Sequence, residues 1–83
     1  MVYGRLLSAR KKTVGAKQTL KAIERGQAKV VYVAQTADRH VIEPILQTCA
    51  SKGVPVIQVD SMLALGKACR IDVGCATASI IEE

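Results

Sequence analysis

The short apolar run "KVVYVA", at residues 29–34, limits the possible fold more than any other feature of the sequence. It is too short for an apolar helix and is rich in β-branched residues, so it predicts a strand that is buried on both faces. A second run, "PVIQVD" at residues 55–60, also predicts a buried strand. A sheet buried on both faces needs helices on each side.

The segment "AKQTLKAIERG" has the spacing of an amphipathic helix. Ala16, Leu20 and Ile23 fall on one side of that helix, which we expect to face the core. The basic residues fall together on another side, at Lys17, Lys21 and Arg25. Gly26 is expected to end the helix as a C-terminal cap.

Three further helices and one further strand are predicted. "YGRLLSARKK" suits a short surface helix with a basic outer side. "TADRH" reads as a turn, and the helix after it is expected to begin close to Glu43, because Pro44 is tolerated only in a first turn, and to stop at Gly53. Asp60 or Ser61 is expected to cap a short helix through "MLALGKAC". "RIDVG" then reads as a loop and "CATASII" as the final strand.

Helices that alternate with short apolar strands predict an α/β fold, a three-layer α/β/α sandwich around a mixed sheet of about four strands. The 83 residues suffice for a single domain, spanning residues 1–83. The chain has no Trp, no Phe and two Tyr, so the core is expected to be aliphatic. The strand order does not follow from the pattern.

The charge balance indicates a polyanionic partner. Twelve Lys and Arg against seven Asp and Glu give a formal net charge of +5, which leaves RNA, DNA and acidic membrane open. With so few aromatic residues, a base-stacking platform is disfavoured. The sequence contains neither a run of about 20 apolar residues nor a secretory signal, so we expect a cytoplasmic protein without a membrane segment.

No catalytic or metal-binding set is recognisable. His40 stands in a polar turn without a nucleophile motif, and it is read as a solvated residue. The acidic residues are scattered, and no phosphate-loop motif occurs. The three cysteines form no CxxC pair, so they are expected to be buried free thiols: Cys49, Cys69 and Cys75. We expect no enzyme activity, no cofactor and no metal.

Two features remain that indicate binding. Gly15 stands directly before a helix whose first N–H groups and dipole favour an anion, with Lys17 and Gln18 in its first turn and Lys21 one turn on. The alternative is an ordinary solvated basic face. In "RIDVG", Ile71 and Val73 are apolar residues in an expected loop, and they either contact a ligand or tuck into the core.

Three stretches together, "GAKQTLKAIERGQAKVVYVAQTAD", "KGVPVIQVDSMLALGKACRIDVG" and "CATASII", resemble the L7Ae/L30e family of ribosomal proteins over nearly the whole chain. Within the family, the chain looks most like the small bacterial YbxF type. The resemblance implies an α/β/α sandwich without catalytic activity. It also implies binding to the RNA kink-turn, a sharply bent helix built around a bulge and tandem sheared G·A pairs.

The resemblance implies that two segments of this chain contact RNA. The helix N-terminus would enter the groove at the G·A pairs through Gly15, Ala16, Lys17, Gln18 and Lys21. The loop before the last strand would cover the unpaired nucleotides through Arg70, Ile71, Asp72, Val73 and Gly74. The implied partner is a kink-turn in ribosomal or riboswitch-like RNA, with the ribosome as a further partner, and we expect a monomer.

The sequence departs from the family at the contact helix. Archaeal and eukaryotic members show Gly-x-Asn-Glu-x-x-Lys, whereas this chain has Lys17 at the Asn position and Gln18 at the Glu position. A neutral amide accepts from guanine amines less strongly than a carboxylate does, so Lys17 is expected to compensate through phosphate and to make binding salt-dependent. The alternative hypothesis is a ribosome-associated scaffold protein that binds phosphate generally, without kink-turn specificity.

Overall fold

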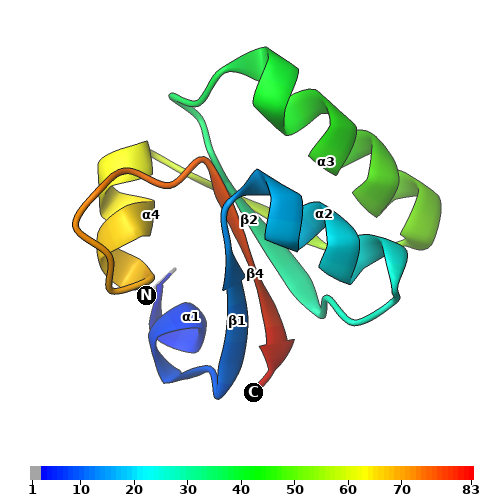
Figure 1. Cartoon of the computed structure of the whole chain (residues 1–83), viewed down its shortest axis with the longest axis horizontal. Helices are drawn as coiled ribbons and strands as arrows, with labels where there is room; N and C mark the ends of the chain where they lie inside the picture. The colour runs from blue at the N-terminus through cyan, green and yellow to red at the C-terminus, as the bar shows by residue number, and fades with distance from the viewer. Residues whose placement is uncertain (1–2) are drawn as a thin grey trace.

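The computed structural model describes residues 3–83, in which helices and short strands alternate along the chain (Figure 1). In chain order the elements are α1 (Gly4–Ser8), β1 (Lys11–Val14), α2 (Ala16–Glu24), β2 (Val30–Ala34), α3 (Arg39–Lys52), β3 (Val56–Val59), α4 (Met62–Ala68) and β4 (Thr77–Glu82).

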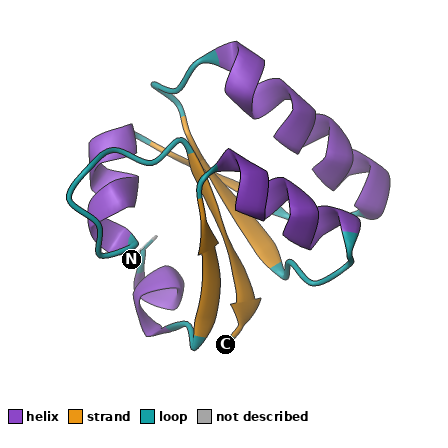
Figure 2. Ribbon diagram, viewed as in Figure 1, coloured by secondary structure: helices purple, strands orange, loops and turns teal. Residues whose placement is uncertain are grey.

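The four strands form one mixed sheet in the order β1-β4-β2-β3. β2 and β3 are parallel, and β4 is antiparallel to both of its neighbours, β1 and β2. α2 and α3 cover one face of this sheet, and α1 and α4 cover the other (Figures 1 and 2). The predicted three-layer α/β/α sandwich is confirmed.

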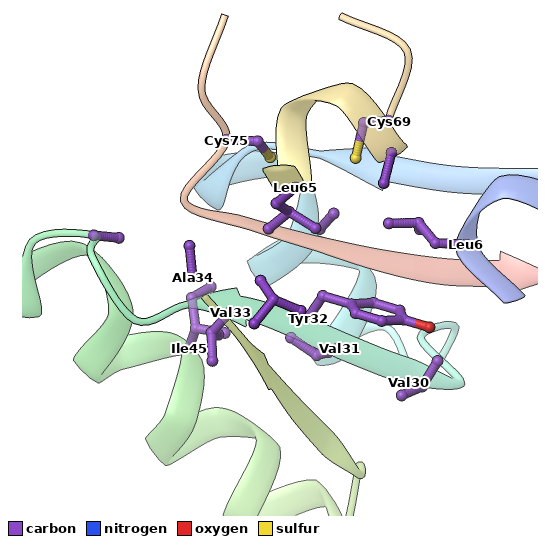
Figure 3. Close-up of a cluster of buried hydrophobic side chains, with 14 of the residues drawn as sticks. Leu6, Val30, Val31, Tyr32, Val33, Ala34, Ile45, Leu65, Cys69 and Cys75 are labelled. Carbon is purple, nitrogen blue, oxygen red and sulfur yellow. The ribbon is translucent and has the colours of Figure 1, made fainter. Parts of the chain in front are cut away.

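The core is built around β2, which has every residue buried, as its sequence predicts. Leu6 of α1 and Leu65 of α4 pack on one side of the sheet, and Ile45 of α3 packs on the other (Figure 3). The prediction for β3 is wrong in part, because only Val59 of that strand is buried. β3 pairs with β2 alone and forms an edge of the sheet, where its outer side stays open to solvent.

β1 was not predicted from the sequence. The segment "KKTV" is largely polar, and it becomes a strand because it pairs with β4 along its length, with an irregularity between Lys11 and Lys12. The first helix is correspondingly shorter than expected and ends at Ser8, so Arg10 and the two lysines lie outside it. Long-range pairing thus overrides a weak local pattern.

The buried face of α2 is rotated from the predicted one. Ile23 is buried as expected, but Thr19 and Ala22 are buried beside it, while Ala16 and Leu20 are only partly covered. A threonine is accepted there because its hydroxyl is hydrogen-bonded to a hydroxyl of β1. A hydrophobicity pattern cannot anticipate a buried residue that is satisfied by a partner from another element.

α3 begins at Arg39 and not near Glu43, so Pro44 lies inside the helix. The cap at Asp38 decides this, because its carboxylate accepts a hydrogen bond of 2.8 Å from the N–H of His40. His40 is exposed as expected, but it lies in the first helical turn. At the other end, Gly53 has a φ of 70° and caps the helix as predicted.

The remaining local predictions agree more closely. Ser61 caps α4 and accepts from the N–H of Ala64 at 3.1 Å. The final strand starts at Thr77, two residues later than expected. All three cysteines are buried and free. Among residues 3–83, no helix is long and apolar enough to cross a membrane.

Tyr32 offers a test of the core, because its ring is fully buried and its hydroxyl has no hydrogen-bond partner in the described chain. A buried polar group without a partner costs about 1–3 kcal/mol. We therefore expect Tyr32→Phe to raise the free energy of unfolding by about 1 kcal/mol, seen as a higher Tm in thermal denaturation. Tyr3→Phe, at a partly exposed tyrosine, serves as the control. A lower Tm for Tyr32→Phe would show that the hydroxyl is satisfied.

Candidate nucleic-acid interface

The Gly15 turn lies at one end of the sheet, beside the start of the strand that follows the second expected RNA-contact segment, residues 70–74. β1 and β4 are antiparallel, so the end of β1 lies beside the start of β4, with Val14 opposite Ala78. The N–H of Gly15 donates to the carbonyl oxygen of Thr77 at 2.9 Å. The chain between α4 and β4 reaches the same point and passes close to the start of α2 (Figure 1).

Gly15 gives the contact turn its shape. Its φ of 95° favours glycine, whereas an added Cβ would meet nothing within 4 Å, so backbone conformation and not crowding selects this residue. Its carbonyl accepts the N–H of Thr19 at 3.1 Å and so begins α2. Since glycine has no side chain to cap the helix, the first N–H groups are left to other acceptors.

A chain of three hydroxyl groups anchors this turn. Thr13 of β1 is hydrogen-bonded to Thr19 of α2 at 2.9 Å and to Ser79 of β4 at 2.6 Å. Thr19 and Ser79 are fully buried. The first turn of α2 is thereby fixed to both strands beneath it. These residues were not identified from the sequence, because isolated Thr and Ser give no signal before their partners are known.

The polar side chains of the turn face outward. Lys17, Gln18 and Lys21 are exposed, and Ala16 is partly buried. The N–H of Val14 donates to Oε1 of Gln18 at 3.4 Å, a long contact that uses one end of the amide. In the described chain, the lysines form no salt bridge, whereas Arg5 and Arg10 pair with carboxylates at the opposite end of β4.

The loop after α4 is held tightly to that helix. The N–H of Arg70 donates to the carbonyl of Lys67, and the N–H of Ile71 donates to the carbonyl of Gly66, each at 3.0 Å. This is the Schellman pattern, which places its capping residue in the left-handed region. Arg70 has that conformation, with a φ of 63°, and is the one non-glycine residue in residues 3–83 with positive φ.

Gly66 explains how the loop closes over α4. A Cβ at this position would lie 2.1 Å from the carbonyl oxygen of Val73, a distance that only glycine permits. The loop is also fixed at its far end, where the N–H of Cys75 donates to the carbonyl of Met62 at 2.9 Å. The glycine of the "GK" dipeptide, Gly66 and Lys67, is therefore explained by the close approach of the loop and not by a phosphate loop.

The two apolar loop residues have different environments. Ile71 is partly buried and packs against the core, whereas Val73 is 67% exposed. Asp72 and Gly74 are exposed between and beside them. Of the two interpretations left open by the sequence, tucking into the core fits Ile71, and availability to a ligand fits Val73.

Comparison with known proteins identifies the family of this chain. The model of the Ribosomal protein L7Ae/L30e/S12e/Gadd45 family matches residues 2–83. An RNA-binding protein of Geobacillus sp. strain WCH70 is 46% identical over 81 residues, which cover 98% of this chain and 99% of that protein. RNA-binding protein YbxF of Geobacillus stearothermophilus is 44% identical over 81 residues, with the same coverage.

A solved structure shows the same arrangement of elements. The Giardia lamblia 15.5kD RNA binding protein superposes with a TM-score of 0.87 at 32% identity, covering 99% of this chain and 69% of that one. The two proteins therefore share the α/β/α sandwich fold. The chain belongs to the Ribosomal protein L7Ae/L30e/S12e/Gadd45 family.

The left-handed Arg70 leads to a stability prediction. A non-glycine residue in this region costs about 1–2 kcal/mol, so Arg70→Gly is expected to raise the free energy of unfolding by about 1 kcal/mol. Arg70→Ala removes the same charge but keeps a Cβ and should not gain stability. Chemical denaturation of both variants gives the comparison. Equal stabilisation by the two would attribute the effect to charge and contradict the proposed strain.

Proposed function

We propose that this protein is a non-enzymatic RNA-binding protein that recognises and stabilises kink-turns in ribosomal or regulatory RNA. The observation that carries the proposal is the hydrogen bond between the Gly15 turn and Thr77, the first residue of the strand into which the loop of residues 70–74 leads. Family membership, the names of the relatives and the net charge of +5 support it. We also propose that it acts in the cytoplasm as a monomer, on its own or with the ribosome.

The Gly15 turn suits recognition of the groove at tandem G·A pairs. Lys17 and Lys21 donate to guanine O6 and N7 or to phosphate, and the Gln18 amide both donates and accepts at a base edge. Among residues 3–83 of the free protein, Oε1 of Gln18 has only the long contact with the N–H of Val14, which a base can replace. The fixed position of the helix end lowers the entropy lost on binding.

The loop of residues 70–74 supplies a different chemistry. Exposed Val73 offers an apolar surface to unstacked bases, where a charged side chain would lose hydration. Arg70 adds a cation for phosphate or for a base plane. Ile71 supports the loop from below, because it is packed against the core.

Such a surface acts on RNA by population shift. A kink-turn interconverts between an extended and a sharply bent form, and the two protein segments match only the form that brings the G·A pairs and the bulge together. A protein that binds one form stabilises that form by its difference in affinity for the two. The fraction of kinked RNA and the fraction of bound RNA are therefore expected to rise over the same range of protein concentration.

Lys17 and Gln18 provide the central test. In a titration of kink-turn RNA carrying two dyes, the wild type is expected to increase energy transfer, and Lys17→Ala and Gln18→Ala to weaken binding about tenfold. Arg25→Ala, at the far end of the same basic face, is the matched control and should change affinity little. Raising the salt concentration should weaken the wild type more than Lys17→Ala, which has lost a phosphate contact.

A duplex with Watson–Crick pairs in place of the G·A pairs separates the proposal from its alternative. Kink-turn binding that survives competition by this duplex supports specific recognition. Equal binding of both RNAs, or equal losses for Lys17→Ala and Arg25→Ala, would leave only general phosphate attraction, as in a ribosome-associated scaffold.

The two apolar loop residues are expected to respond differently. Val73→Ser should weaken kink-turn binding several-fold with little change in Tm, since the side chain is 67% exposed. Ile71→Ser should lower the Tm, because it places a hydroxyl against the core. Binding and thermal denaturation of both variants test this. Unchanged RNA affinity for Val73→Ser would remove the loop's apolar contact from the proposed interface.

A further inference from the structure

The helix that carries Lys17 and Gln18 is packed against the core mainly through its far end. The apolar residues that α2 buries, Ala22 and Ile23, lie in its second half, whereas the buried residue of its first half is Thr19. Burial of apolar side chains is non-directional. Packing at the far end therefore does not by itself fix where the N-terminal end of the helix lies.

A pair of hydroxyl groups holds that N-terminal end. Oγ1 of Thr13 in β1 lies 2.9 Å from Oγ1 of Thr19 in α2, and 2.6 Å from Oγ of Ser79 in β4. Thr13 precedes the contact turn of residues 15–18 and Thr19 follows it directly, so their hydrogen bond closes the turn across its two ends. Because a hydrogen bond weakens steeply away from its preferred distance and angle, it restricts the position of the turn more closely than apolar packing does.

We propose that the hydroxyl of Thr19 is a positioning group for RNA binding: through its hydrogen bond with Thr13, it holds Lys17 and Gln18 in the geometry that a kink-turn requires. The inference rests on the proposed function, because it concerns the affinity of the same surface. Thr19 acts through its neighbours and not by touching RNA, since its side chain is fully buried beneath the turn.

Folding stability alone does not require a hydroxyl at this position. Replacing it with a methyl group loses a hydrogen bond of modest net value, and it also removes the cost of taking a polar group out of water. Valine has nearly the shape of threonine and a similar helix propensity. With valine at position 19, Thr13 would remain hydrogen-bonded to Ser79. Stability and positioning can therefore be separated by substitution.

Two substitutions at Thr19 separate the roles of its hydroxyl and its methyl group. Thr19→Val removes the hydroxyl, and its kink-turn affinity is expected to fall about fivefold, because the contact turn must then be ordered on binding. Its Tm should equal or exceed that of the wild type. Thr19→Ser keeps the hydroxyl and loses the methyl group, so its affinity should match the wild type although its Tm falls. Titration of labelled kink-turn RNA and thermal denaturation measure the two quantities.

Thr48→Val is the matched control. The Thr48 hydroxyl donates to the carbonyl of Pro44 within α3 at 2.8 Å, so its loss should leave kink-turn affinity unchanged. Amide hydrogen exchange of the free protein adds a measurement without RNA. The N–H groups of Gly15 and Thr19 are hydrogen-bonded around the turn, and they should exchange faster in Thr19→Val than in Thr19→Ser, each relative to the amides of β2 in the same variant.

Affinity that simply follows overall stability would overturn the proposal. This is the case if Thr19→Val loses affinity in proportion to a lower Tm, or if Thr19→Ser loses as much affinity as Thr19→Val. Unchanged affinity for Thr19→Val overturns it as well. If the wild type binds kink-turn and control duplex alike, the proposed function fails instead, and the exchange rates still decide whether the hydroxyl anchors the turn.

Discussion

The pairing of β4 between β1 and β2 is the constraint on which the rest of the structure depends. This pairing places the start of β4 beside the end of β1. It also makes β4 an inner strand of the sheet, hydrogen-bonded to β1 on one side and to β2 on the other. At Thr77, the side chain also donates to the carbonyl of Tyr32 at 2.7 Å, so one residue ties β2, β4 and the Gly15 turn together. The candidate interface is a consequence of this arrangement.

Hydrogen bonds between polar groups and close packing hold the two segments of the candidate interface in place. The hydroxyl chain through Thr13 holds the helix end, and the hydrogen bonds around Gly66 hold the loop. Arg70, in contrast, destabilises the loop, because a glycine would adopt its left-handed backbone conformation with less conformational strain. Strain of this kind tends to occur at functional sites, which agrees with a binding role for the arginine. A surface with fixed donors suits the proposed ligand, an RNA that is bent when bound.

Sequence patterns predicted the elements with strong local signals and missed those decided by distant partners. The run of residues 29–34 was recognised as a doubly buried strand, and the Ser61 cap and the Gly53 stop were found. β1 was missed, because a polar tetrapeptide has no strand signal without β4. The start of α3 was misplaced, because the cap at Asp38 outweighed the proline rule.

The sequence by itself determined the α/β class, the aliphatic core and the excess of positive charge, because these follow from residue type and local spacing. It also nominated the two candidate segments, one from helix periodicity and one from apolar residues in a loop. Only the tertiary structure decided that the Gly15 turn is hydrogen-bonded to the first residue of β4, and that Ile71 packs inward while Val73 remains exposed. The physical reason is that antiparallel pairing of β1 with β4 joins residues distant in sequence, and no local pattern encodes that contact.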